Sequence, residues 1–238
     1  MLRLTFVDNR FHVTPGDWED QTEEALDKLF GEHRQSFKKD SHGFIPARFD
    51  VCDGACPVEN PPIGKRHRAD KHVLAVTALV VDLDSSPDLE SIQAGHLKYW
   101  LYSSHSHDPS SGKFKFRLVF PFKKEVVGIS VTDWKVLYRE LCKRLSISNY
   151  DTTCENISRI FYLPACLPSR SVATLKNQGE LLDANFVWQE IQAARDAELA
   201  KQAQAPLATI HPIKPGLYEG LPKVMFARLS NEPRTEPW

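Results

Sequence analysis

The chain has 238 residues, 42% of them hydrophobic and 26% charged, which is the composition of a globular protein large enough to bury a sizeable core. Its 30 Lys and Arg residues nearly balance 31 Asp and Glu residues, and the formal net charge of −1 gives no reason to expect a polyanionic partner from overall charge alone. Apolar runs stay shorter than the ~18–20 residues of a membrane span, and no secretory apolar segment is evident near the first residue. We therefore expect a cytoplasmic protein with reduced cysteine thiols and no membrane partner.

The first part of the chain is predicted to form an N-terminal α/β module. Thr14 is a good N-cap, Pro15 suits a first helical turn and Gly31 is a typical helix end. The apolar spacing between them therefore predicts a helix. Polar loops follow, with a short strand at 47–52 between them.

The most regular part of the sequence begins at Val73. The β-branched run from Val73 to Val81 is typical of a strand buried on both faces. The elements predicted after it are a helix at 86–95, strands at 97–107 and 113–122, a helix at 130–146 and a strand at 157–163. This β-α-β-β-α-β order is that of a ferredoxin-like or RRM-like unit, in which the first strand lies between the third and the fourth.

The C-terminal part differs in composition. Residues 186–204 have the apolar spacing of a last helix, and residues 206–238 contain six prolines without periodicity, which indicates a linker or docking segment. The expected fold class is α+β, built around an RRM-like catalytic sheet. Its predicted parts are the N-terminal α/β module at 1–72, the catalytic module at 73–170, a helical segment at 171–205 and a proline-rich tail at 206–238.

Two aspartates, Asp82 and Asp84, end the first strand of this unit. Because they are two residues apart, their carboxylates point to the same face, with Cα atoms roughly 6.5–7 Å apart. Such a pair is costly unless it is neutralised or binds a cation, and oxygen ligands suit Mg²⁺ or Mn²⁺. Two such ions would clamp an in-line phosphoryl displacement. The alternative interpretation is a solvated strand end.

Histidine and basic residues are predicted to meet the aspartates at one end of the sheet. Ser103, His105 and His107 alternate at the end of the second strand and are expected to share a face. The predicted locus comprises Asp82, Asp84, His105, His107, Lys115, Arg117, Asp151 and Arg159. Carboxylates beside basic and histidine side chains are what a metal–triphosphate site needs.

Two further patterns indicate ligands less specifically. Nine Lys and Arg residues against three acidic ones lie between residues 113 and 145, an excess that suits a nucleic-acid backbone. Cys52-x3-Cys56 followed by His67-x4-His72 has the ligand order of a Cys2His2 zinc site. The gap between the halves is short and apolar core residues are missing. The sequence therefore favours a polar loop with incidental thiols and leaves zinc binding open.

The chain resembles the archaeo-eukaryotic primase superfamily, and most of all the primase-polymerase domains of phage and plasmid replication proteins. The resemblance lies in the order of LVVDLD (79–84), YSSHSH (102–107), FRLVFP (116–121) and YDTTCENISRIFYLP (150–164). The motifs of that family are an Asp-x-Asp/Glu, a Ser-x-His and a later carboxylate, set in an RRM-like sheet. The resemblance implies template-directed nucleotidyl transfer with two Mg²⁺ or Mn²⁺ ions, held by Asp82, Asp84 and Asp151.

The resemblance also implies roles for the remaining candidates. Ser103 and His105 fit the Ser-x-His motif and would hold the phosphates of the incoming nucleotide, with His107 as a second candidate. Charge alone suggests that some basic residues upstream contact the template. The predicted nucleotide-binding residues are Ser103, His105, His107, Lys115, Arg117 and Arg159, and the predicted nucleic-acid-binding residues are Lys65, Arg66 and Arg68.

The expected function is a DNA primase-polymerase that makes primers on single-stranded DNA from ribo- or deoxyribonucleoside triphosphates. We expect a phage or plasmid gene in a bacterial or archaeal host, with a helicase domain or protein as a further partner. One alternative is a rolling-circle (HUH-like) initiator nuclease, which needs an apolar residue between paired histidines and a nucleophilic tyrosine. The other is a non-catalytic RRM-like single-strand binder, which needs exposed sheet aromatics. The sequence favours neither, because these features are missing from the expected positions.

Overall fold

The computed structural model describes residues 2–38, 42–54, 63–84 and 89–204. Contacts divide the chain into two compact units, Met1–Asp196 and Ala197–Trp238. The tail predicted at 206–238 lies outside the described residues, and the division of the chain into four parts stays a prediction. No described helix is long and apolar enough to cross a membrane.

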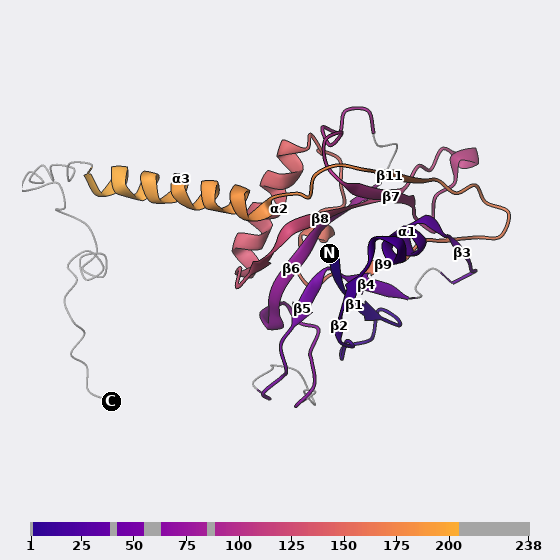
Figure 1. Cartoon of the computed structure of the whole chain (residues 1–238), viewed down its shortest axis with the longest axis horizontal. Helices are drawn as coiled ribbons and strands as arrows, with labels where there is room; N and C mark the ends of the chain where they lie inside the picture. The colour runs from indigo at the N-terminus through magenta and orange to yellow at the C-terminus, as the bar shows by residue number, and fades with distance from the viewer. Residues whose placement is uncertain (1, 39–41, 55–62, 85–88, 205–238) are drawn as a thin grey trace, which may run out of the picture. The chain divides into compact units, whose positions relative to one another are not determined.

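The main sheet of the first unit has five strands in the order β11-β7-β8-β6-β5, all antiparallel to their neighbours (Figure 1). Its strands are β5 (Ala47–Phe49), β6 (Val73–Leu83), β7 (Tyr99–Ser103), β8 (Phe116–Val127) and β11 (Thr174–Asn177). The predicted strands at 73–81 and 113–122 are confirmed in β6 and β8, whereas the strand predicted at 97–107 is confirmed only over Tyr99–Ser103 as β7. The three strands are neighbours in the predicted order. Strand β6 is buried over nearly its whole length, as its continuous apolar run predicts.

The predicted place of the fourth strand is wrong. Only Phe161 and Tyr162 of the predicted 157–163 strand form a strand, β9, and it pairs with β4 (Gly43–Ile45) in a second sheet. The position beside β6 belongs instead to β5. The described part of the helix predicted at 86–95 forms turns rather than a helix. An α+β fold with antiparallel sheets is therefore present, but its topology differs from the regular RRM-like order.

The second sheet has the order β2-β1-β4-β9, with β1 at Leu2–Val7 and β2 at Trp18–Gln21. The helix predicted from Thr14 therefore begins later. Helix α1 spans Glu23–Gly31, and Thr22 is its N-cap, with a side chain that accepts from Ala25 N. Gly31 is the last helical residue, as predicted. A two-stranded parallel sheet joins β3 (Arg34–Gln35) to β10 (Ala165–Cys166).

Helices cover both faces of the main sheet. Helix α2 (Val131–Arg144), capped by Ser130 as predicted, packs Trp134 against Phe122 on one face. On the other face, the ring of Phe30 of α1 stacks on Tyr102 of β7 at 5.6 Å. Helix α3 (Ala184–Gln204) follows β11, and short 3-10 turns lie at Asp70–His72, Pro109–Ser111 and Thr152–Glu155.

Candidate functional site

A pocket lies where β6 ends. Its lining joins residues from the end of β6, the turn after β7, the start of β8 and the segment before β9. The lining residues are Asp82, Asp84, Ser104, His105, Ser106, Lys115, Phe116, Arg117, Asp151, Arg159, Ile160, Tyr162 and Leu163. Seven of the eight residues of the predicted locus, all but His107, are therefore brought together, although the sheet order differs from the predicted one.

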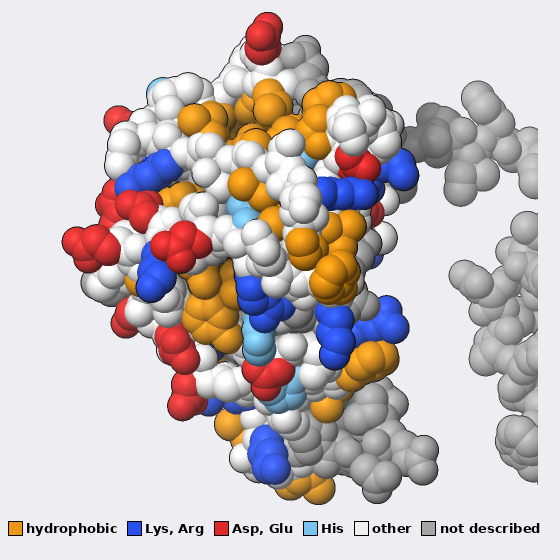
Figure 2. Space-filling model, turned by 90° about the vertical axis from the view of Figure 1, so that its right-hand side faces the viewer, with side chains coloured by type: hydrophobic (Ala, Val, Ile, Leu, Met, Phe, Trp, Pro, Cys, Tyr) orange, Lys and Arg blue, Asp and Glu red, His pale blue; other side chains and the backbone are white. Residues whose placement is uncertain are grey.

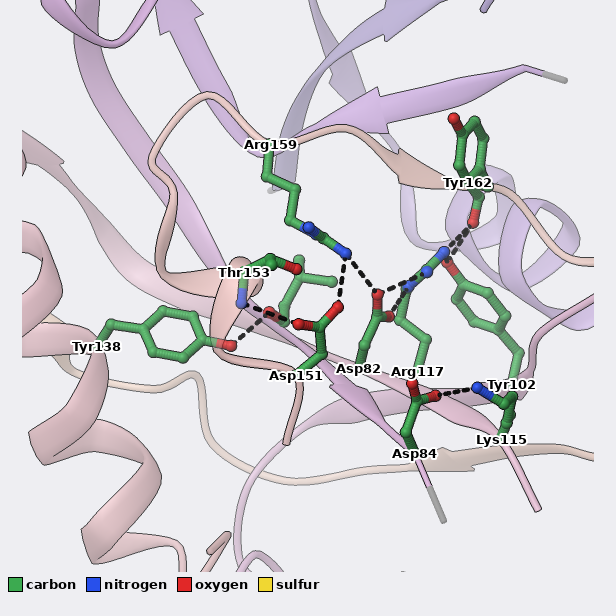
Figure 3. Close-up of polar contacts among 11 residues, drawn as sticks. Asp82, Asp84, Tyr102, Lys115, Arg117, Tyr138, Asp151, Thr153, Arg159 and Tyr162 are labelled. Carbon is green, nitrogen blue, oxygen red and sulfur yellow. Dashed lines mark hydrogen bonds and ion pairs between the residues drawn. The ribbon is translucent and has the colours of Figure 1, made fainter. Parts of the chain in front are cut away.

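Asp82 and Arg117 form the buried centre of this pocket (Figure 3). They are direct partners across β6 and β8, so both side chains leave the same face of the sheet. Arg117 donates through Nε and Nη2 to the two carboxylate oxygens of Asp82, the second contact being 3.0 Å long, and the two side chains are only 8% and 13% exposed. Arg117 also donates to the carbonyl of Tyr162. Burial alone would lower the pKa of Arg117, but its contacts with Tyr102 and Asp82 outweigh this effect and raise the pKa.

Asp151 enters the site through the 3-10 turn that it caps. Its amide donates to the carbonyl of Asp82 at 3.0 Å, and its side chain accepts from Thr153 N at 2.9 Å. Arg159 Nη2 lies 2.9 Å from an Asp151 oxygen and 3.5 Å from an Asp82 oxygen, so one guanidinium bridges two carboxylates (Figure 3). Burial works against the charged form, but Thr153 and Arg159 hold the pKa of Asp151 below its ordinary value.

Asp84 lies at the more open side of the pocket. It follows the last residue of β6, and its carboxylate is 3.0 Å from Lys115 Nζ, with the two side chains 48% and 31% exposed. Screening by water makes this pair weak compared with the buried Asp82–Arg117 pair. Lys115 is therefore held at Asp84 less firmly than Arg117 is held at Asp82.

The two histidines of the predicted site separate. Strand β7 ends at Ser103, and the chain then turns, so Ser103, His105 and His107 do not share a strand face as predicted. His105 lines the pocket, and its Nε2 donates to the carbonyl of Ser36 at 2.9 Å. His107 is buried, with its ring 4.8 Å from that of Phe116 and its Nδ1 accepting from Lys115 N.

Ser103 is also absent from the pocket lining. It is 1% exposed, and its hydroxyl lies 3.0 Å from His33 Nε2 and accepts from Ala173 N at the same distance. The His33 ring also contacts the carbonyl of Ser103 at 2.8 Å. These contacts link the end of β7 to the segments before β3 and β11. Ser103 thus has a visible structural role beside the nucleotide-binding role predicted for it.

The donor atoms near Asp82 suit a hard divalent cation. Ligand atoms of Asp82, Asp151 and Cys154 lie within 4.8 Å of one another. Burial raises the pKa of the Cys154 thiol to about 12, and a sulfur donor is a soft ligand that does not suit Mg²⁺ or Mn²⁺. The useful donors are therefore carboxylate oxygens, with Asp84 two residues from Asp82, and oxygen donors select Mg²⁺ or Mn²⁺ over soft metals.

A second, more open depression shares Arg159, Ile160 and Tyr162 with the pocket. It adds Arg10, Arg68, Lys135, Thr152, Thr153, Glu155 and Asn156 to them. Of the predicted template-contacting residues, Arg68 lies here, Lys65 is exposed, and Arg66 pairs with Asp17. On the face drawn in Figure 2, most acidic side chains lie toward the left, with some basic ones among them, and most basic side chains lie at the centre and right.

Several residues of the pocket carry no signal in the sequence. Ser104, Ser106 and Tyr162 line it, but turn serines are common, and Tyr162 binds Arg117 through a backbone carbonyl. Tyr102 donates to the same carbonyl at 2.9 Å, and burial raises its pKa to about 12, so it remains a donor. Arg10 and Lys135 lie 125 residues apart in the sequence, and only the fold places them in one depression.

Comparison with known proteins gives two matches. The family described as "VapE N-terminal domain" matches residues 62–200, which is more than half of the chain and includes every motif of the predicted site. Among solved structures, the AEP domain of the cyanophage S-2L primase-polymerase (PrimPol) matches with a TM-score of 0.39 and 16% identity, over 79% of this chain and 86% of that one. No curated protein matches the chain significantly. The recognition of this domain type from its motifs is confirmed.

Proposed function

The chain belongs to the VapE N-terminal domain family, and we propose that it is a DNA primase-polymerase. The reaction is template-directed nucleotidyl transfer on single-stranded DNA in phage or plasmid replication. The observation that carries the proposal is the convergence of Asp82, Asp84 and Asp151 with His105, Lys115, Arg117 and Arg159 around one pocket. Carboxylates facing cationic side chains are the groups that a triphosphate and its metal ions require.

In this proposal, Asp82, Asp84 and Asp151 hold the divalent cations. Bound there, Mg²⁺ or Mn²⁺ supplies the charge that activates a primer 3′-hydroxyl and stabilises the departing pyrophosphate. Arg117 acts on Asp82 as a positioning residue, since its donors are engaged by Asp82 and by the carbonyl of Tyr162. Direct contact between Arg117 and the nucleotide, expected from the sequence, would need these bonds to break.

We assign phosphate binding to Arg159, Lys115 and His105. Arg159 Nε is buried and has no hydrogen-bond partner among the described residues, so its guanidinium holds an unused donor. Among the described residues, the ion-pair partner of Lys115 is the half-exposed Asp84. Cations bound by the aspartates would release both basic side chains toward an anion. His105 lines the same pocket and offers a further polar contact.

The template strand is proposed to pass over the depression beside the pocket. Arg10, Arg68 and Lys135 supply positive charge there, and Arg159 lies in both linings. Contacts of this kind neutralise backbone phosphates without reading sequence. Lys65 and Arg66 stay candidates for the outer part of this path, and a helicase partner stays a proposal.

The test is primer synthesis on unprimed single-stranded DNA with labelled nucleotides and Mg²⁺ or Mn²⁺. The wild-type chain is compared with the Asp82→Asn/Asp84→Asn variant, and Lys38→Ala, an exposed change outside both linings, is the matched control. We expect oligonucleotides from the wild type and the control only. Absence of product from a folded wild type on several templates would overturn the proposal.

The same samples separate the two alternative functions. A rolling-circle nuclease would leave a covalent tyrosine–DNA adduct, although His105 and His107 make separate contacts here, with Ser36 O and Lys115 N. A non-catalytic binder would retain single-stranded DNA in filter binding equally well before and after the double aspartate substitution, and neither protein would make product. The covalent adduct and the retention of DNA on the filter can both be measured whether or not the protein makes primers.

A further inference from the structure

Three metal-ligating side chains outside the pocket converge in the described structure. Cys52 follows β5, His67 lies in the next loop, and His72 ends the 3-10 turn before β6. Their exposed fractions are 1%, 5% and 9%, and one ligand atom from each lies within 4.8 Å of the other two. The His67 and His72 rings have centroids 5.3 Å apart. Buried sulfur and imidazole donors thus gather from three separate positions.

Backbone hydrogen bonds hold this arrangement. Cys52 N donates to Lys65 O at 2.8 Å, and Gly64 N donates back to Cys52 O at 2.9 Å. The amide of Asp50 donates to His72 O at 2.7 Å, while the carbonyl of Asp50 accepts from His67 N at 3.3 Å. Asp50 therefore ties both histidines to the strand that leads to Cys52. Gly64 has a φ of +74°, a conformation that glycine adopts without strain.

The donor set and its spacing suit zinc. A thiolate with two imidazoles is a typical partial ligand set for Zn²⁺, with Zn–S near ~2.3 Å and Zn–N near ~2.0–2.1 Å, so tetrahedral donors lie roughly 3.3–3.7 Å apart. The three ligand atoms already lie within 4.8 Å of one another, so binding one ion would require at most a small rotation of each side chain. The cluster contains no carboxylate, which separates it from the Mg²⁺-type oxygen donors of the pocket.

We propose that Cys52, His67 and His72 bind a structural zinc ion. The sequence spacing favoured a loop with incidental thiols, but burial and convergence of the three donors favour a built site. Cys56, the other cysteine of that pattern, lies outside the described residues and has no place in the proposed site. A tetrahedral ion takes one further donor, and Cys52 loses its thiol proton on binding.

The proposed zinc site lies next to the segment that forms one wall of the basic depression. Residues between the two histidines reach the loop that carries Arg159: the Asp70 carboxylate accepts from Asn156 Nδ2 at 3.1 Å and from the Ser158 hydroxyl. Arg68 donates to the carbonyls of His12 and Arg10 at 3.0 and 2.9 Å. A metal ion that fixes this segment would therefore brace one wall of the basic depression. The proposal does not depend on the primase-polymerase activity.

The experiment measures metal in the full chain. The metal content of protein purified without chelators is measured by inductively coupled plasma mass spectrometry. Co²⁺ is then exchanged into the protein, because a thiolate ligand gives Co²⁺ an ultraviolet charge-transfer band. We expect one zinc ion per chain, the band in the wild type, and loss of both in Cys52→Ser and His72→Asn. Cys166→Ser, which changes a buried cysteine outside the cluster, should keep them.

Two results would overturn the site. One is a folded wild type that takes up neither Zn²⁺ nor Co²⁺ at stoichiometric concentration, and the other is a Cys52→Ser variant with an unchanged band and metal content. If Cys52→Ser fails to fold, the wild-type Co²⁺ spectrum alone decides, since no thiolate band means no cysteine ligand. The Asp82→Asn/Asp84→Asn variant should keep its zinc, so failure of the catalytic proposal leaves this result untouched.

Discussion

Asp82 and Arg117 face each other directly across β6 and β8, and the Arg117 guanidinium donates to both carboxylate oxygens of Asp82. The pair is almost fully buried, and Tyr162 O and the Tyr102 hydroxyl surround the same guanidinium. A buried charge pair of this kind orients its members more than it stabilises the fold, because desolvation offsets most of the attraction. Asp82 is thereby presented to the pocket in one orientation.

The first prediction concerns removal of this partner. Arg117→Ala leaves a carboxylate that is 13% exposed and whose remaining ion-pair partner among the described residues is Arg159 at 3.5 Å. We therefore expect a loss of about 3–5 kcal/mol in the free energy of unfolding. Arg117→Lys should lose less but still weaken the protein, since an ammonium cannot reproduce the two-pronged contact. Urea unfolding followed by circular dichroism measures both.

The matched control is Lys115→Ala, which removes the partner of Asp84 from the same pocket. That pair is partly exposed, so the expected loss is about 0–1 kcal/mol. Equal losses in Arg117→Ala and Lys115→Ala would contradict the view that burial distinguishes the two carboxylates.

The central strands were predictable because their signals are local. The apolar run of β6 and the alternation in β8 depend only on neighbouring residues, and so does the Ser130 cap of α2. The position beside β6 is a different kind of property, because β5 takes it through pairing with residues far away in sequence. Residues 157–163 carry a strand-like pattern, but most of them form the loop that brings Arg159 to Asp151.

In the candidate site too, the residues placed by local sequence patterns could be predicted, and those placed by turns or backbone contacts could not. Asp82 and Asp84 could be placed from the end of β6, and Arg117 from its alternation along β8. The split between His105 and His107 could not, because the chain turns after Ser103 and a turn breaks the two-residue period. Contacts made through the backbone, such as that of Arg117 with Tyr162 O, leave no trace in residue type.

The second prediction separates the two histidines by what each substitution damages. His105→Ala removes a side chain of the pocket lining, so we expect a raised KM for the nucleotide and a change below about 1 kcal/mol in unfolding free energy. His107→Ala removes a buried ring packed on Phe116 and should cost about 1–3 kcal/mol while leaving KM nearly unchanged below the melting temperature. Steady-state primer extension and thermal melting measure the pair, and the reverse pattern would refute the assignment.

The third prediction is a pH dependence that involves Glu155. Hydrogen bonds from Arg139 lower the pKa of Glu155, and a hydrogen bond from the Tyr150 hydroxyl lowers it further. Burial acts in the opposite direction, but the pKa remains below its ordinary value. A carboxyl group with a depressed folded-state pKa stabilises the protein above its unfolded value of about 4.3, and this contribution is lost as the pH falls through the folded value. Glu155→Gln should therefore lower stability by about 1–2 kcal/mol at pH 7 and flatten the acid limb.

Chemical unfolding at pH values between 7 and 3 tests this dependence. Arg139 is 63% exposed, so water and salt partly screen its interaction with Glu155. At high salt we therefore expect the loss of stability in Glu155→Gln to be about 1 kcal/mol. Glu190→Gln, which removes the exposed partner of Arg144, is the control and should cost less than about 1 kcal/mol at pH 7. If the stability of Glu155→Gln fell with decreasing pH as steeply as that of the wild type, Glu155 would not be a source of the acid sensitivity.

The last prediction concerns Gly43, where β4 meets β9. A Cβ atom at this position would lie 2.6 Å from Ile160 Cγ2 and 2.9 Å from Phe161 O, and the carbonyl cannot rotate away as a side chain could. Gly43→Ala should therefore push the 160–162 segment outward, cost about 1–3 kcal/mol, and reduce primer synthesis, because Ile160 and Tyr162 line the pocket. Gly31→Ala, with nothing within 4 Å of the new atom, is the control and should keep or slightly raise the melting temperature. If Gly43→Ala melted like the wild type and synthesised primers at the same rate, the close packing of β4 against the pocket wall would not matter for the site.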